Sequence, residues 1–237
     1  MERTAILEVE GLSCRFGGVT ALNDVTLALR RGEFRCVIGP NGAGKTTFVN
    51  AITGIVKSSE GRVRLDGEPL NRRTPARLAR AGVLRTFQTP RVFGALTVAE
   101  NFALAARFDR AFEERGRSLR EDLGFTGREQ AIASQLSQGE RKRLEIGMAF
   151  MRSPRVILLD EPTAGMSGAE TREVASAIRK YGSEAATVII EHDMGFVREI
   201  ADTVSVLHRG SLLMEGTLDE VQADQRVRDI YLGSGVH

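Results

Sequence analysis

Residues 39 to 47 read GPNGAGKTT and have the residue types and spacing of a phosphate-binding loop. The pattern Gly-x-x-x-x-Gly-Lys-Thr follows a short apolar run and precedes a helical segment, which is the context that a P-loop requires. Backbone N–H groups of such a loop wrap a β-phosphate, and the dipole of the following helix favours the same anion. The residues predicted to bind a nucleotide are Gly39, Pro40, Asn41, Gly42, Ala43, Gly44, Lys45, Thr46 and Thr47.

Lys45 is the residue of this loop that carries a full charge. In a P-loop the lysine ammonium reaches the β- and γ-phosphates, and the next hydroxyl, here that of Thr46, ligates Mg²⁺. The chain has 33 lysines and arginines, and its lysines are Lys45, Lys57, Lys142 and Lys180. A lysine at this position, in a chain that otherwise uses arginine, favours a phosphate site over an ordinary glycine-rich turn, because its ammonium acts as a compact point charge.

Two carboxylates end an apolar run in VILLDEP, at 156–162. Short continuous apolar runs are typical of parallel strands buried on both faces, and α/β sheets bind ligands at the carboxyl ends of such strands. Asp160 is predicted to hold Mg²⁺ through water, and Glu161 to orient or activate the attacking water. The alternative is a carboxylate pair that only closes a strand, and the phosphate loop in the same chain favours the metal site.

His192 and Gln88 are two further candidates for this site. His192 follows the apolar run at 187–190, where its imidazole can contact a departing γ-phosphate, although a lone loop histidine is often incidental. The neutral amide of Gln88, in RTFQTP, can touch Mg²⁺ or the attacking water, but taken alone it is typical of a surface glutamine. The predicted catalytic residues are Glu161 and His192, and the predicted metal ligands are Thr46, Asp160 and Gln88.

A second Gly/Ser motif, LSQGE at 136–140, lies far from the phosphate loop in the sequence. Ser137 and Glu140 have the spacing of a capping box that opens a helix over 139–151. Three cations at 141–143 follow in the first turn, where the helix dipole disfavours them by about 0.3–1 kcal/mol each. Because local rules tend to break at functional sites, the Ser137 hydroxyl and the Gly139 N–H predict a second anion site.

The elements that position these residues follow from the hydrophobic pattern. Antiparallel strands are predicted where apolar and polar residues alternate, at 6–16, 25–29 and 62–67. Buried parallel strands are predicted at the short apolar runs 34–38, 156–159 and 187–190. Helices are predicted at 45–54 and 168–181, and a closing hairpin with Arg209-Gly210 at its turn is predicted at 203–216.

The segment 89–153 has a helical character that sets it apart. Three more capping-box signatures lie within it, at Thr97–Glu100, Ser118–Glu121 and Thr126–Glu129. We predict an α/β fold in which a P-loop (RecA-like) core sheet carries an antiparallel β subdomain and an inserted helical subdomain. The core with its β subdomain is expected at 1–88 and 154–237, and the helical subdomain, which carries LSQGE, at 89–153.

Composition narrows the classes of function. A net charge of +2 without a basic stripe argues against a nucleic-acid partner. No apolar run reaches the ~20 residues of a membrane span, and none opens the chain as a signal peptide, so we expect a cytoplasmic protein that meets a membrane only through partners. Cys14 and Cys36 lie in apolar runs without metal-ligand spacing, which predicts buried thiols in a reducing compartment.

Five features in order, GPNGAGKTT, Gln88, LSQGE, VILLDEP and His192, resemble those of the ATP-binding subunit of ABC transporters, over essentially the whole chain. The resemblance implies ATP and Mg²⁺ as cofactors. It also implies a head-to-tail dimer, in which the signature loop of one subunit closes over the γ-phosphate held by the other; here that loop is Ser137, Gln138, Gly139 and Glu140. It gives Phe16 the role of stacking on adenine, with a core position at a strand end as the alternative.

Further segments resemble importer subunits for branched-chain amino acids and, more closely, urea: RTFQTPRVFGALTVAEN, RLEIGMAF, EPTAGMS, EHDMGFVREIAD, VLHRG and RDIYLG. This resemblance implies an ATPase that powers the uptake of a small polar solute such as urea, a short amide or a branched-chain amino acid. Its implied partners are a second ATP-binding subunit, two membrane permease subunits and a solute-binding protein. A permease groove is expected around 87–102, where Phe87, Phe93 and Phe102 are either apolar contacts or core residues.

The chain departs from the usual LSGGQ signature at Gln138 and Glu140, and Ser167 stands where many relatives have aspartate. Glu140 places a negative charge near the expected γ-phosphate, unless it only caps its own helix. One rival class is a soluble ABC-type ATPase that is not coupled to transport, which usually has two cassettes or a long coiled-coil insertion. A P-loop kinase or GTPase is another rival, and both LSQGE and the lack of an NKxD motif count against it.

Overall fold

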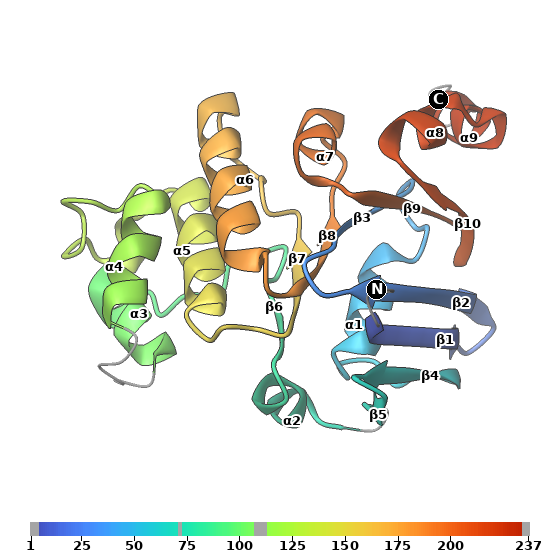
Figure 1. Ribbon diagram of the computed structural model, residues 1–237, viewed down its shortest axis with the longest axis horizontal. Helices are drawn as coiled ribbons and strands as arrows, with labels where there is room; N and C mark the ends of the chain where they lie inside the picture. The colour runs from blue at the N-terminus through green and yellow to red at the C-terminus, as the bar shows by residue number, and fades with distance from the viewer. Residues whose placement is uncertain (1–4, 71–72, 107–112, 234–237) are drawn as a thin grey trace.

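The computed structural model describes residues 5–70, 73–106 and 113–233, and it contains two sheets and their covering helices (Figure 1). The larger sheet has the strand order β10-β9-β3-β8-β7-β6. Its strands are β3 (Phe34–Ile38), β6 (Val83–Arg85), β7 (Val156–Asp160), β8 (Ala186–Ile190), β9 (Thr203–His208) and β10 (Ser211–Gly216). All neighbours pair in parallel except β9 and β10, which form the predicted antiparallel hairpin.

The central strands β3, β7 and β8 are buried along their whole length. This is why they appear in the sequence as continuous apolar runs rather than alternating ones. Since they run in parallel, their carboxyl ends meet at one edge of the sheet, and the polar residues that follow each strand gather there.

The smaller sheet is antiparallel, with the order β2-β1-β4-β5. Its strands are β1 (Ala5–Phe16), β2 (Val19–Arg30), β4 (Glu60–Leu65) and β5 (Glu68–Pro69). The inward-facing side chains of this sheet share a core with one face of the larger sheet. Cys14 lies in that core and Cys36 in the core on the other face of the larger sheet, and both are buried free thiols as predicted.

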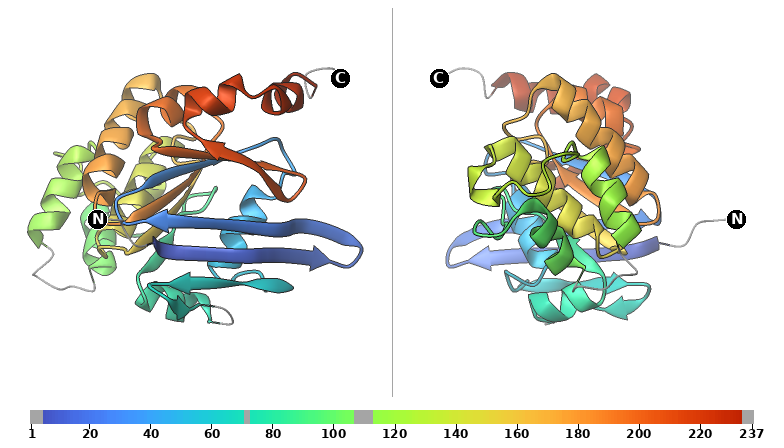
Figure 2. Two further views of the ribbon diagram at one scale, coloured as in Figure 1. Left: turned by 45° about the vertical axis from the view of Figure 1, so that its right-hand side comes forward. Right: turned by 90° about the vertical axis from the view of Figure 1, so that its left-hand side faces the viewer.

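Nine helices are described: α1 (Lys45–Ile52), α2 (Pro75–Arg80), α3 (Val98–Ala105), α4 (Glu113–Asp122), α5 (Gln138–Phe150), α6 (Gly168–Gly182), α7 (Met194–Ile200), α8 (Leu218–Ala223) and α9 (Gln225–Gly233). The chain leaves the larger sheet after β6, forms α3, α4 and α5, and returns at β7, the strand that pairs with β6. These three helices lie on the opposite side of the molecule from β1 and β2 (Figure 1), and α8 and α9 lie beside β9 and β10, away from β4 and α2 (Figure 2). Among the described helices, none has the length and apolar character needed to cross a bilayer.

The predicted helix starts have mixed outcomes. The capping boxes at Thr97 and Ser137 are confirmed. Ser118 lies inside α4 rather than at its start, and residues 126–129 form a turn in which the Gly127 N–H donates to the Glu129 carboxylate, so both of these predictions are wrong. In each case the local Ser/Thr-x-x-Glu pattern is present, but the chain does not begin a helix there.

The three phenylalanines of the expected permease groove differ in how much of each side chain is exposed. Phe102 is buried and packs edge-to-face on Phe125 inside the helical lobe, so it is a core residue and not a surface contact. Phe87 is partly buried under the guanidinium groups of Arg85 and Arg91. Phe93 is 52% exposed and is therefore the most exposed of the three.

Candidate nucleotide-binding site

The phosphate loop leaves the N-terminus of α1 open. Gly44 occupies the N-cap position with φ 103°, and no side chain caps the helix. A Cβ at Gly44 would lie 2.6 Å from the Ala21 carbonyl oxygen, so only glycine fits both the conformation and the space. The first N–H groups of α1, including that of Thr46, therefore remain available to an anion.

The Lys45 side chain folds back over its own loop. Its Nζ donates to the Gly39 carbonyl at 2.7 Å and to the Pro40 carbonyl at 3.0 Å. Burial lowers the pKa of this ammonium, and the charges of Glu161 and Asp160 oppose that shift. The two carboxylates therefore act electrostatically on the loop lysine.

The turn between β9 and β10 holds the back of the phosphate loop. The Gly210 N–H donates to the Ala43 carbonyl at 3.0 Å, and the Gly210 carbonyl accepts from the Asn23 N–H at 2.8 Å. The turn therefore links the loop to the β2 strand of the smaller sheet.

Asp160 and Glu161 lie at the carboxyl end of β7. Asp160 is buried, and its carboxylate lies 3.5 Å from a guanidinium nitrogen of Arg85. Burial raises the pKa of the Asp160 carboxyl, and the Arg85 charge opposes the shift. Glu161 has a positive φ of 45°, a strained conformation for a residue with a side chain and one that is common at functional sites.

Gln88 meets Glu161 in space. The Gln88 side-chain amide nitrogen lies 3.4 Å from a Glu161 carboxylate oxygen. These two residues are far apart in the sequence, and the contact places both at the same edge of the sheet as Asp160. The amide and the carboxylate can therefore form hydrogen bonds to the same water molecule.

The donor set suits Mg²⁺. No group of three or more His, Cys, Asp and Glu side chains in the described part of the chain is arranged to hold a metal by itself. Mg²⁺ in phosphoryl-transfer sites is usually bound by one or two protein oxygens together with substrate phosphates and waters. The Thr46 hydroxyl, the Asp160 carboxylate and the Gln88 amide oxygen are hard ligands of this kind.

The loop after β8 is organised by Glu191, a residue that the sequence analysis did not single out. Its buried carboxylate accepts from the Thr163 N–H and hydroxyl and from the N–H groups of His192 and Asp193. Glu191 thereby joins the loop that follows Glu161 to the loop that carries His192. The His192 side chain is 75% exposed, and its Nδ1 lies 3.7 Å from the Glu191 carboxylate.

The LSQGE segment closes its own helix start. The Ser137 hydroxyl accepts from the Glu140 N–H at 3.2 Å, and the Glu140 carboxylate accepts from the Ser137 N–H at 2.8 Å. Arg128 forms an ion pair with the other oxygen of Glu140. No hydrogen bond described for residues 137–140 reaches the phosphate loop at 39–47.

Two of the three cations in the first turn of α5 make contacts within the chain. Lys142 is fully buried and bonds to backbone carbonyls of its own chain, and Arg143 pairs with Glu170 at 3.1 Å. These contacts account for the position of Lys142 and Arg143 near the helix N-terminus, and the anion site at Ser137 and Gly139 stays a prediction.

Phe16 and Ser167, two further positions singled out in the sequence, lie in different surroundings. Phe16 is 49% exposed at the end of β1, so the alternative of a core residue is wrong and stacking on adenine stays a prediction. Ser167 caps α6 in a capping box with Glu170. The serine at this position thus has a local structural function.

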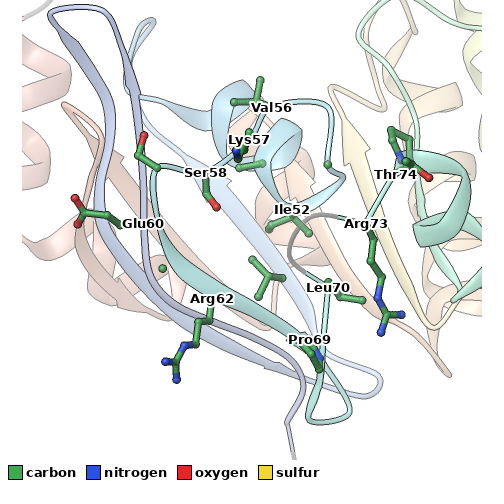
Figure 3. Close-up of a pocket in the computed structure, with 16 residues that line it drawn as sticks. Ile52, Val56, Lys57, Ser58, Glu60, Arg62, Pro69, Leu70, Arg73 and Thr74 are labelled. Atoms are coloured by element: carbon green, nitrogen blue, oxygen red, sulfur yellow. The ribbon is translucent and has the colours of Figure 1, made fainter.

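A separate hollow of about 990 Å³ lies at the other end of α1 (Figure 3). Ile52, Val56 and Leu70 line it together with the charged residues Lys57 and Arg73. None of the predicted site residues borders it. The hollow is therefore distinct from the phosphate loop, which begins the same helix.

Comparison with known proteins identifies the family. A family model described as "ABC transporter" matches residues 22–164, the part of the chain with the phosphate loop, LSQGE and both carboxylates. The chain belongs to the ABC transporter family. A second model, described as "Branched-chain amino acid ATP-binding cassette transporter", matches residues 211–237 of this ABC chain.

Curated ABC relatives match over nearly their full length. The high-affinity branched-chain amino acid transport ATP-binding protein BraF of Pseudomonas aeruginosa is 36% identical, over 96% of this chain and 98% of the relative. The corresponding LivG protein of Escherichia coli gives the same identity and coverage.

Solved ABC cassettes confirm the predicted fold class. A nucleotide-free cassette from an ABC transporter has a TM-score of 0.85 at 31% identity, over 96% of this chain and 99% of that one. A cassette in its ADP conformation has a TM-score of 0.87 at 30% identity, over 97% and 99%. This ABC chain is accordingly an ATPase whose reaction is coupled to transport.

Proposed function

We propose that the chain is the ATP-hydrolysing subunit of an importer for a small polar solute, with branched-chain amino acids as the first candidates. The observation that supports the catalytic part is the 3.4 Å approach of Gln88 to Glu161 beside Asp160, within range of the Lys45 charge. The relatives' names and the match at 211–237 support the solute class.

Each site residue has a role in this proposal. Lys45 and the open N-terminus of α1 bind the phosphates of ATP, and Phe16 stacks on its adenine. Thr46, Asp160 and Gln88 hold Mg²⁺, which neutralises charge on the phosphates when bound. Glu161 takes a proton from the attacking water, and His192 contacts the γ-phosphate.

The LSQGE segment acts on a second subunit in this proposal. Ser137 and Gly139 face the nucleotide of a partner cassette, either a second copy of the chain or another ATP-binding subunit. ATP then closes the pair, and hydrolysis reopens it. Two permease subunits hold the pair at the inner face of the membrane and receive solute from a binding protein.

Dimerisation tests the trans role of LSQGE. In a Glu161→Gln variant, ATP should persist and hold a dimer, which size-exclusion chromatography detects. Adding Ser137→Glu places a carboxylate against the γ-phosphate of the partner. Because like charges at a closed interface repel by several kcal/mol, dimerisation should vanish. The ATP affinity of the monomer should stay within about twofold, since its own phosphate loop is unchanged. The test is run with the chain alone and with its second ATP-binding subunit. Loss of monomer affinity as well would exclude the trans role.

Uptake assays test the solute. A strain that lacks the chain should lose uptake of labelled leucine, isoleucine and valine, and the wild-type chain but not Glu161→Gln should restore it. Urea and short amides are measured in parallel, because the sequence resembles urea importers too. If uptake of every solute is unchanged while the purified chain hydrolyses ATP, a role outside this transport process replaces the proposal.

A further inference from the structure

Two buried charged side chains on one face of α5 form hydrogen bonds with the backbone of Phe87, the residue before Gln88. Lys142 and Glu145 are one helical turn apart, with 0% and 6% of their surface exposed. The Lys142 ammonium donates to the Phe87 carbonyl at 2.6 Å and to the Asp160 carbonyl at 2.5 Å. A single side chain of α5 thus joins the backbone before Gln88 to the backbone before Glu161.

Glu145 holds the other side of the same peptide segment. Its Oε1 accepts from the Phe87 N–H at 3.2 Å and from the Arg91 N–H at 3.0 Å. Both backbone polar groups of Phe87 are therefore bonded to side chains of α5. Gln88 is the next residue, so its starting position is set by these bonds.

The cluster is not arranged for the best stability. The Glu145 Oε2 atom is buried and has no hydrogen-bond partner, and it lies 3.8 Å from the Lys142 ammonium. Burial lowers the pKa of Lys142 and raises that of Glu145, so keeping both charged is costly. Replacing a buried ion pair by less polar residues of similar size is often neutral or stabilising. A requirement other than stability would explain the retained pair.

We propose that Lys142 and Glu145, here called the α5 clamp, are positioning residues for ATP hydrolysis. The clamp fixes Gln88 and the Asp160–Glu161 pair relative to each other and to Ser137, which begins the same helix. This inference rests on the proposed roles of those residues. Misplacement of a catalytic group by about 1 Å can reduce a rate by two orders of magnitude, so loss of the clamp lowers kcat. ATP binding depends on the phosphate loop and stays unchanged.

A purely structural role for the pair predicts a different result, and a charge-neutral double variant separates the two. Lys142→Met alone leaves the buried Glu145 carboxylate without its cation and therefore destabilises the fold. Lys142→Met/Glu145→Gln removes that imbalance, and the thermal unfolding temperature should return most of the way to wild type. In this double variant the Lys142 bonds to both carbonyls are still missing.

The experiment measures unfolding temperature, ATP affinity and kcat on each purified variant. We expect the double variant to keep ATP affinity within about twofold and to lose at least about tenfold in kcat, as for a misaligned site. Recovery of kcat together with stability would overturn the proposal. If the double variant does not fold, the single variant Glu145→Gln is measured instead. Its amide oxygen is a weaker acceptor, so kcat should fall severalfold at unchanged ATP affinity. An unchanged kcat would refute the clamp.

Two controls complete the design. Arg143→Met removes the neighbouring buried charge, which pairs with Glu170 and touches neither Phe87 nor Asp160. This variant should lose stability without losing kcat per folded molecule. Lys45→Ala and Glu161→Gln test the proposed function itself. If these two variants retain binding and hydrolysis, the assigned site is wrong. If they lose activity as expected but the Lys142→Met/Glu145→Gln variant stays active, only the clamp is rejected.

Discussion

The helices α1 and α5 begin in opposite ways, although the sequence predicts an anion site at both N-termini. α1 starts at Gly44 without a side-chain cap and without an acidic residue in its first turn. α5 starts at Ser137 with a complete capping box, an acidic Glu140 and an ion pair to Arg128. One helix start is open to a ligand, and the other satisfies part of its own hydrogen-bonding potential.

The difference shows how one chain can contain two Gly/Ser motifs at helix starts that bind in different ways. An open, uncapped start binds phosphate by itself, since its N–H groups have no competing acceptor. A capped start with a carboxylate at its third position offers little to a free anion. Changes at α1 should therefore affect a single chain, and changes at α5 should act mainly when a second subunit is present.

Lys45→Ala should have the largest effect. The charge that contacts the β- and γ-phosphates is lost, and we expect turnover to fall by at least about 10²-fold, the size of removing one preorganised donor from a transferring group. Steady-state ATPase assays and nucleotide titration measure this. Lys57→Ala, which removes the next lysine of the chain from the rim of the separate hollow, is the matched control and should leave turnover intact. Equal losses in both variants would contradict the phosphate-loop assignment.

Replacing one glycine at each helix start compares the two directly. Gly44→Ala forces a side chain into φ 103° and against the Ala21 carbonyl, so ATP binding should be lost and the unfolding temperature should drop, with a backbone cost of about 1–3 kcal/mol. At Gly139 a Cβ would lie 3.0 Å from the Gly165 carbonyl oxygen, a tight contact in an ordinary helical conformation. Gly139→Ala should therefore leave ATP affinity of the isolated chain within about twofold while weakening ATP-driven dimerisation, because α1 is unchanged. Equal loss of affinity in both variants would remove the distinction.

Arg128→Ala sharpens the account of α5. Without this guanidinium the Glu140 charge faces the partner's nucleotide uncompensated, and ATP-driven dimerisation in the Glu161→Gln background should weaken by about fivefold, or roughly 1 kcal/mol for a partly exposed pair. In a Glu140→Gln background the same Arg128→Ala change should have almost no effect. Analytical ultracentrifugation of the four variants gives the coupling, and an equal effect in both backgrounds would show that Arg128 acts independently of Glu140.

Ser137→Ala should lower the free energy of unfolding by about 1 kcal/mol, because the N-cap of α5 is lost. The pKa of Glu140 lies below its ordinary value of 4.5: burial opposes this shift, but hydrogen bonds from Ser137 and the Arg128 charge outweigh it. Its contribution is therefore fully present above pH 4.5 and is lost as the pH falls through the lower folded-state pKa. Denaturant unfolding at pH 7 and at pH 3 should show a smaller wild-type-to-variant difference at the lower pH. A difference that grows on acidification would contradict the capping role.

The parts of the site that depend on local pattern were predictable. The phosphate loop, the β7 strand with Asp160 and Glu161, and the Ser137 cap each depend on residues adjacent in sequence, where spacing and hydrophobic runs carry the information. The short elements β6 and α2 were missed because three or six residues show no clear period. Ser118 and Thr126 show the converse, since a cap pattern is necessary for a capping box but does not create a helix.

Contacts between distant segments could not be predicted in the same way. Lys142 and Glu145 have the spacing of an ordinary surface pair on a helix, and nothing in the sequence shows that α5 packs over Phe87 and the end of β7. Glu191 likewise appears as one acid in a loop until four donors converge on its carboxylate. Burial of charge is a property of tertiary packing, and it identifies the residues that connect one motif to another.

The attachment of the helical lobe has a consequence for the engineering of this protein. Its two connections leave and re-enter at β6 and β7, which are hydrogen-bonded neighbours, with Val83 opposite Val156. Because the two strands are parallel, the chain leaves at the carboxyl end of β6 and re-enters at the amino end of β7, and the pairing of the two strands fixes the separation of these points, whatever the lobe contains. We therefore expect that lengthening the lobe at a point away from α5 leaves the register of β6 and β7 intact.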